Sequence, residues 1–154
     1  MVDSYVIPFS KEEYHSLLHG PRSFEERTLG DSSARFTYFS QKKISIFATF
    51  EGVIIDTHRC TSLDELQSNE PFGRVVIRNG NNGAIGARYL HVTPLVTIGD
   101  VVKVGDLVAD LMVDPRPPTL PGGKPPEYWH FHLDFFDITA DKLSSPLAVT
   151  LHER

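Results

Sequence analysis

Short apolar runs separated by turn residues dominate the pattern of hydrophobic and polar positions along the chain. Runs at 44–50, 53–57, 74–78 and 87–92 are rich in β-branched and aromatic residues, and Asn79-Gly80-Asn81-Asn82-Gly83 follows the third. Runs of this length and composition, bounded by Gly and Asn, are typical of β-strands joined by tight turns. The pattern therefore predicts a mainly β fold.

A repeated Gly-Asp dipeptide marks the segment at 96–111. Gly99-Asp100 and Gly105-Asp106 stand six residues apart and interrupt short apolar runs. Because Gly and Asp both favour tight turns, we expect this segment to fold back on itself twice, with the two aspartates as turn residues rather than ligands. A further apolar run lies at 147–151.

One short helix is predicted near the N-terminus. Ser10 and Glu13 fit a capping box, an apolar stripe of helical spacing follows, and a Gly-Pro pair ends the pattern. These signals predict a helix at about 11–19. Together with the turn-rich stretch that follows, they divide the chain into an N-terminal extension at 1–34 and a β domain at 35–154.

The strand-like run around 128–136 carries most of the candidate chemistry. His130, His132 and Asp134 alternate there with Phe131, Leu133 and Phe135. Successive side chains of a strand point to opposite faces, so we expect the polar three on one face and the apolar three in a core. Two imidazoles beside a carboxylate are typical of a metal or acid–base site. For Asp134, two interpretations stay open: a solvated strand-end carboxylate, or a group that orients a histidine.

Two neighbouring features bear on a binding groove. Tyr128 and Trp129 precede the histidines; they either line the groove, where they would stack on a sugar or peptide, or fill the edge of the core. Residues 113–126 hold six prolines and two adjacent glycines, which predicts an irregular loop. A loop at this position is a candidate wall or lid for the site.

Composition and charge exclude several functions. The chain has 154 residues, 23% of them charged, and a formal charge of −5. Because nucleic acids and anionic membranes require a basic surface, we expect neither as a partner. No apolar stretch approaches the ~20 residues of a membrane span. The single cysteine, Cys60, allows no intrachain disulfide and no cysteine-rich zinc site.

The first residues of the sequence are the part that bears on localisation. No basic segment followed by an apolar run begins the chain, so a signal peptide is not visible. Cytoplasmic localisation is therefore our expectation, with export by a dedicated route as the alternative. The sequence does not define an oligomeric state.

Five segments, in one order, resemble the lysostaphin-type zinc metallopeptidases. They are Gly52-Val53-Ile54-Ile55, Val75-Val76-Ile77 with Gly80 and Gly83, Tyr89-Leu90-His91-Val92, residues 96–111, and His130-Phe131-His132-Leu133-Asp134. Phe47-Ala48-Thr49-Phe50-Glu51-Gly52 is also similar to the family's aromatic-Ala-x-x-Asp-Gly segment. The resemblance covers roughly residues 42–136. It implies a duplicated-hybrid-motif β-sandwich, the fold on which this family cuts peptide cross-links of bacterial cell walls.

The resemblance also implies roles for three histidines. His132 matches the zinc ligand in the family's His-x-His motif, and His91 and His130 match its two catalytic histidines. The family's other two ligands, from a His-x-x-x-Asp motif, would fall near Ser33 and Thr37. No such motif occurs between residues 1 and 60, and neither Ser nor Thr is a usual zinc ligand.

The missing ligands leave three interpretations of the histidines. Our hypothesis is a degenerate lysostaphin-type domain, a non-catalytic binding or regulatory module for a peptide, glycan or protein partner, with zinc absent or weakly bound. Some members of the family that have lost their zinc ligands act in this way. The alternative is a metal-dependent peptidase or hydrolase whose altered ligand set is His91, His130 and His132. In the third interpretation, the histidines are structural only.

Overall fold

The computed structural model describes residues 3–6, 8–10, 34–38, 44–59, 73–111, 129–140 and 149–152, and within these ranges the chain is almost entirely β. The strands are β1 (Asp3–Val6), β2 (Ala34–Tyr38), β3 (Ser45–Phe47), β4 (Gly52–His58), β5 (Arg74–Asn79), β6 (Ile85–Leu90), β7 (Val92–Pro94), β8 (Val101–Val102), β9 (Leu107–Leu111), β10 (Trp129–Asp137) and β11 (Val149–His152). A 3₁₀ turn, η2 (Ile138–Ala140), follows β10. The predicted mainly β fold is confirmed.

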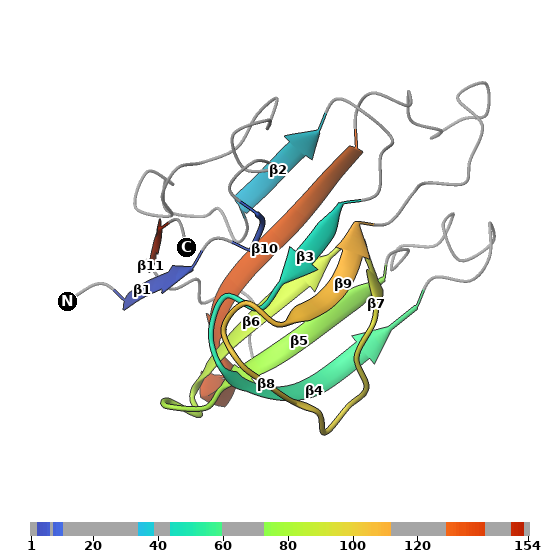
Figure 1. Ribbon diagram of the computed structural model, residues 1–154. Coiled ribbons are helices and arrows are strands. Elements are labelled where there is room, and N and C mark those ends of the chain that lie inside the picture. The colour runs from blue at the N-terminus through green and yellow to red at the C-terminus, as the bar shows by residue number, and fades with distance from the viewer. Residues whose placement is uncertain are drawn as a thin grey trace.

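The strands form two antiparallel layers and one additional pair. The larger sheet has the order β2-β10-β6-β5-β4-β8, and the smaller has the order β3-β9-β7. Figure 1 shows the smaller sheet lying over one face of the larger, as in a β-sandwich. The pair of β1 and β11 is parallel and joins segments from the two ends of the chain.

The hydrophobic core lies between the two layers. From the larger sheet it receives the fully buried side chains of Ile54, Ile77 and Tyr89, and from the smaller sheet those of Ile46 and Val108. The apolar side of β10 was expected to enter this core. Leu133 and Phe135 do so, with exposed fractions of 0% and 1%. The side chain of Phe131 lies outside the described part of the chain.

Tyr89, the one phenol in the core formed by the described residues, has a polar contact there. The Tyr89 hydroxyl accepts a hydrogen bond from the Thr49 backbone N–H at 3.0 Å and lies 3.0 Å from the Thr49 hydroxyl. Both residues are buried. Burial raises the pKa of the Tyr89 hydroxyl to about 12, because an ionised phenol would lose its hydration there. The contact links β6 to the loop between β3 and β4.

The Gly-Asp repeat forms two turns of the same construction. Asp100 Oδ2 accepts a hydrogen bond from the Thr97 N–H, and Asp106 Oδ2 accepts one from the Lys103 N–H, both at 2.8 Å. The preceding glycines have φ angles of +97° and +82°, a region that favours glycine. Asp100 and Asp106 are therefore turn residues, as predicted.

Several sequence predictions can be compared with the strands. The runs predicted at 53–57 and 74–78 match β4 and β5 within one residue at either end. The run predicted at 87–92 is two strands, β6 and β7, because the chain bends at His91. The parallel pairing of β1 was not predicted. The helix at 11–19, Cys60 and the loop at 113–126 lie outside the described residues and stay predictions.

The first residues of the predicted N-terminal extension contact the sandwich. The Val6 N–H donates to the Thr49 carbonyl at 3.1 Å, and the Phe47 N–H donates to the Pro8 carbonyl at 2.8 Å. Phe9 is buried in the core. The boundary at residue 34 stays a prediction. Among the described residues, no helix is long and apolar enough to cross a membrane.

Candidate functional site

The backbone of β10 places the His-x-His motif between two strands. His130 is the register partner of Thr37 in β2, and His132 is the partner of both Arg35 in β2 and Leu90 in β6. The side chains of Trp129, His130 and His132, and all of Tyr128, lie outside the described part of the chain. Their roles at a metal or in a groove therefore stay predictions, while the positions of the three strand residues along β10 are defined.

His91 lies at the bend where the chain leaves the larger sheet for the smaller one. Its φ of +67° is in the left-handed region, which is uncommon for residues other than glycine. The N–H groups of His91 and Val92 both point to the Gly73 carbonyl, at 2.9 and 3.3 Å. A Cβ at Gly73 would lie 1.9 Å from the Val92 carbonyl oxygen, so only glycine permits this approach. The bend is thus fixed by backbone contacts.

The sheet register brings the backbones of His91 and His132 together. Leu90, the residue before His91, is paired with His132, and Cα atoms of such pairs are about 4.5–5.5 Å apart. His91 is also partly exposed. Strained backbone at a polar, accessible residue is commonly found at functional sites. This corner of the sheet is therefore the candidate site that the described residues support.

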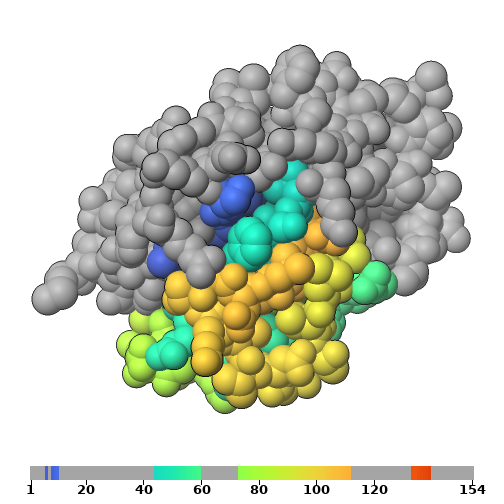
Figure 2. Space-filling model, viewed as in Figure 1, coloured from blue at the N-terminus to red at the C-terminus, as the bar shows by residue number. Residues whose placement is uncertain are grey.

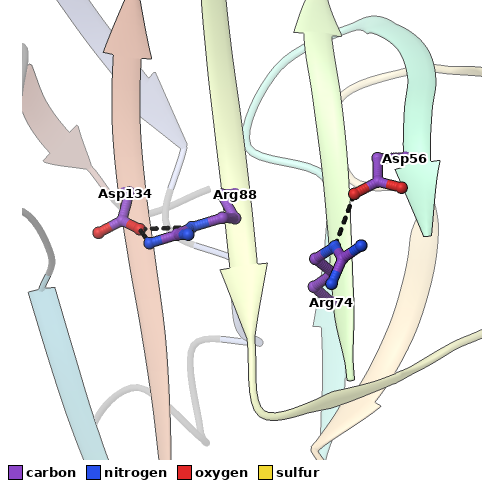
Figure 3. A network of polar contacts seen from close by, with 4 residues as sticks. All are labelled: Asp56, Arg74, Arg88 and Asp134. Carbon is purple, nitrogen blue, oxygen red and sulfur yellow. Dashed lines mark hydrogen bonds and ion pairs between the residues drawn. The ribbon is translucent and has the colours of Figure 1, made fainter. Parts of the chain in front are cut away.

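Asp134 is not solvated, so that interpretation of the sequence is wrong. Its side chain is 1% exposed, and Arg88, its partner across β6 and β10, donates to Oδ2 from Nε at 2.8 Å and from Nη2 at 2.5 Å (Figure 3). Arg88 itself is half-buried, with 21% of its side chain exposed. Burial of the carboxylate is tolerated because the guanidinium supplies opposite charge and two donors.

A second ion pair lies on neighbouring strands of the same sheet. Arg74 Nε donates to Asp56 Oδ2 at 2.6 Å, and Figure 3 shows this pair beside that of Arg88 and Asp134. The register places Asp56, Val76, Arg88 and Asp134 in one row across four strands. This pair is 32% and 41% exposed, so solvent screens it and it contributes little to stability.

The described donors do not by themselves form a zinc centre. No group of three His, Cys, Asp or Glu side chains that could hold a metal occurs among the described residues. The Asp134 carboxylate is engaged with Arg88, and the register partner of His130 is a threonine. The set of His91, His130 and His132 stays a prediction, because two of these side chains lie outside the description.

Solved structures identify the fold. A zinc-containing peptidase from Vibrio cholerae aligns with a TM-score of 0.56 at 16% identity, over 92% of this chain and 37% of its own. Lysostaphin aligns with a TM-score of 0.53 at 15% identity, over 84% and 47%. Csd3 from Helicobacter pylori aligns with a TM-score of 0.55 at 11% identity, over 96% and 34%. The chain therefore has a lysostaphin-type fold, and it spans less than half the length of each of these proteins.

Comparisons of sequence add nothing to this assignment. No protein family and no curated protein matches the chain. At identities of 11–16%, the structural likeness shows the fold alone. The fold implied by the five segments of the sequence is thus confirmed, whereas the roles of the histidines must be argued from this chain's own residues.

Proposed function

We propose that this chain is a degenerate lysostaphin-type domain that binds a peptide, glycan or protein partner along β10 without cleaving it. The observation that carries the proposal is the pairing of Thr37 with His130. Counted along the sequence, Thr37 is the position where the family's aspartate ligand would fall. The register supports that count, because it places residue 37 directly beside the His-x-His motif.

The chemistry of the neighbouring residues supports a role other than metal catalysis. Zinc sites in proteins use Cys, His, Asp and Glu. Thr37 and Arg35 are the β2 partners of His130 and His132, and neither belongs to this set. The acid that follows the motif, Asp134, neutralises Arg88. The proposal therefore assigns no step to a metal.

The same features suit a binding surface. The ion pair of Arg88 and Asp134 ties β6 to β10 directly beside the pairing of Leu90 with His132. A rigid sheet that presents imidazole and phenol groups can hydrogen-bond to and stack on a peptide or sugar. Tyr128, His91, His130 and His132 are the residues we assign to this surface. Trp129 has the same alternation along β10 as Leu133, so for it we favour the other interpretation, the edge of the core.

Rebuilding the missing ligands tests the proposal. The wild-type chain, the Ser33→His/Thr37→Asp variant, and that variant with His132→Ala are dialysed against zinc, and bound metal is measured. The first should hold little zinc, the second about one zinc per chain, and the third little again, because the added ligands complete a three-ligand set. Circular dichroism verifies that all three fold.

The opposite pattern would reject the proposal. If the wild-type chain retains about one zinc per chain and loses it on His132→Ala, a native ligand set exists. The chain would then fit the alternative, a metal-dependent hydrolase. Cleavage of a soluble cross-linked peptidoglycan peptide by the zinc-loaded wild type, abolished by His91→Ala, would establish that function.

One observation fits this alternative as well as it fits the proposal, so we keep both. The backbone of His91 is strained at φ +67° and lies next to the partner of His132. Such strain persists only where the surrounding structure holds the residue in place, and it is common at functional sites. A ligand that His91 helps to bind would explain the strain equally well, so zinc stoichiometry is the measurement that separates the two functions.

A further inference from the structure

The connector between β7 and β9 repeats a six-residue pattern. Residues 95–100 and 101–106 each read aliphatic, Val, polar, aliphatic, Gly, Asp, and Leu107-Val108 begins a third copy. The two copies also make the same backbone contacts. Gly99 N–H donates to the Ile54 carbonyl and Gly105 N–H donates to the Ala48 carbonyl, at 2.8 and 3.0 Å. The repeat is thus structural as well as sequential.

The second position of each copy points inward. Val102 and Val108 are 4% and 0% exposed and belong to the core, and Val96 packs partly against it. These side chains anchor the connector to the sandwich. Burial of apolar surface and the two Asp-capped turns therefore hold this segment in one conformation.

The remaining aliphatic positions point outward. Every large hydrophobic side chain that is exposed within the described residues comes from this connector or from the first residue of β9: Leu95 at 47%, Ile98 at 58%, Val101 at 78%, Val104 at 40% and Leu107 at 46%. We call these five side chains the aliphatic surface. Figure 2 shows their segment, yellow to orange, as one continuous area of the visible face. Scattered apolar side chains are ordinary on a surface, but a gathered set marks an interaction site.

The aliphatic surface is separate from the candidate site. β8, which carries Val101, is at one edge of the larger sheet, and β10 is near the other. Four strand spacings separate them, about 19 Å. A ligand on β10 therefore does not reach Val101, and the inference does not rest on the proposed function, although Leu95 follows His91 by only four residues.

The size of the surface favours a short segment over a second copy of the chain. Five aliphatic side chains exposed to this degree present on the order of 500 Å². A stable interface between folded proteins needs roughly 800 Å² from each partner. A peptide segment in extended conformation needs less, and β8 offers it the edge of a sheet within the described part of the chain.

The charges beside the surface favour a basic segment. Asp100 and Asp106 are exposed within the connector, and Glu51 is exposed beside β8, next to the pair of Gly52 with Val102. Lys103 is the one cation of the connector. Val101 of β8 is paired with Val53 of β4, and Val53 is in turn paired with the cation Arg78 of β5. Around β8, these three exposed carboxylates therefore outnumber the two cations, and a third cation, Arg59, lies at the other end of the connector, where its Nη2 donates to the Pro94 carbonyl at 2.9 Å.

We propose that the aliphatic surface docks an extended segment of a partner protein that carries alternating aliphatic side chains and basic residues. The segment pairs with the edge at β8 and buries its aliphatic side chains against Ile98 and Val101. Because the connector is already ordered by its turns, the partner segment alone loses conformational freedom on binding.

A synthetic peptide is the probe. Acetyl-Lys-Val-Thr-Val-Lys-Val-Lys-amide is titrated into ¹⁵N-labelled protein, and amide shifts are followed by NMR. We expect amide shifts confined to residues 95–107 and to β4. The dissociation constant of the Ile98→Ser/Val101→Ser variant should be at least tenfold higher than that of the wild type. Thr97→Ser, a change in the same connector at a polar exposed position, is the matched control and should bind as the wild type does. A peptide with Glu in place of each Lys should bind at least tenfold more weakly.

Four results of the titration would overturn the proposal. They are no shifts at millimolar peptide, shifts along β6 and β10 instead of the connector, equal binding of the acidic peptide, and unchanged binding by the double serine variant. Sedimentation velocity examines the other occupant: concentration-dependent dimerisation abolished by Val101→Ser would assign the surface to a second copy and reject the peptide. Thermal unfolding of each variant verifies that the exposed substitutions leave the fold intact.

Discussion

The Gly-Asp connector and the His-x-His strand are equally conspicuous in the sequence. The structure of the connector is determined by neighbouring residues, whereas the surroundings of the His-x-His strand are determined by distant strands. The connector's two turns use residues three apart: Thr97 with Asp100, and Lys103 with Asp106. The contacts of β10 come from β2 and β6, and its buried ion pair joins residues 46 positions apart. A local motif therefore defines its own geometry, while the function of His-x-His depends on what distant strands place beside it.

This difference explains why the Gly-Asp repeat indicates the local fold, whereas the His-x-His motif alone does not determine function. The turn residues Gly99 and Gly105 adopt the positive φ that their sequence predicts. The histidines match a zinc-peptidase motif, but Thr37 and Arg35 stand across from them on β2. Substitutions that test distant contacts should therefore have larger effects than those that test a single turn.

The largest effect is expected from Arg88→Met. This change leaves the buried Asp134 carboxylate without its guanidinium, and breaking such a pair typically costs about 3–5 kcal/mol. Urea unfolding monitored by circular dichroism measures the change in the free energy of unfolding. The double variant Arg88→Met/Asp134→Leu is the control; it should recover most of the loss, since an apolar pair of similar size leaves no buried charge. A loss below 1 kcal/mol for the single variant would contradict the buried pair.

A smaller effect is expected from Tyr89→Phe. Removing the hydroxyl deprives the buried Thr49 N–H of its acceptor, which typically costs about 1–3 kcal/mol. Thermal or urea unfolding at neutral pH measures this loss. Thr49→Val, which removes the other hydroxyl but keeps the backbone donor, is the matched comparison and should cost less than Tyr89→Phe.

The same tyrosine predicts an alkaline dependence of stability. Its pKa is about 12 in the folded chain and near 10 when unfolded, so above pH 10 the folded state binds more protons. Its contribution is complete below pH 10 and falls by up to about 1.4 kcal/mol per pH unit as pH rises toward 12. Tyr89→Phe should remove this part of the slope. An identical slope in wild type and variant between pH 10 and 12 would contradict the buried phenol.

The smallest effects are expected in the connector. Asp100→Ala and Asp106→Ala each remove one hydrogen bond from an exposed turn, at a cost of about 1 kcal/mol. Because the two turns have the same construction, the two losses should agree within about 0.5 kcal/mol and add in the double variant. Urea unfolding of the three variants measures this. Clearly unequal losses would show that the two turns, although alike in sequence, contribute differently to the free energy of unfolding.

The sequence was sufficient for those parts of the fold that neighbouring residues determine. The strands around Ile54 and Ile77 and the two Gly-Asp turns follow from apolar runs and turn residues. The break at His91 was not predicted, because Gly73, eighteen residues earlier, supplies the carbonyl that bends the chain. β1 was missed because Asp3–Val6 is short and its hydrogen-bond partners, β11 and Thr49, are distant in the sequence.

The candidate site was predictable to a lesser extent. The alternation of side chains correctly placed Leu133 and Phe135 in the core. The same alternation placed Asp134 on the opposite face, but could not indicate that the face is buried there or that Arg88 is its partner. That information needs the register of β6 against β10. The available signal was a charged residue within each of two apolar strands, Arg88 in β6 and Asp134 in β10. It indicates an ion pair only once the pairing of the two strands is known.

We propose that the His-x-His strand lies in a lysostaphin-type fold that lacks a complete zinc ligand set. The most direct test is the zinc-to-protein ratio of wild-type chain purified without chelators, measured by elemental analysis beside His132→Ala. Both proteins should carry the same small amount of zinc. About one zinc per wild-type chain, lost in His132→Ala, would contradict it and establish a metal site built on this strand.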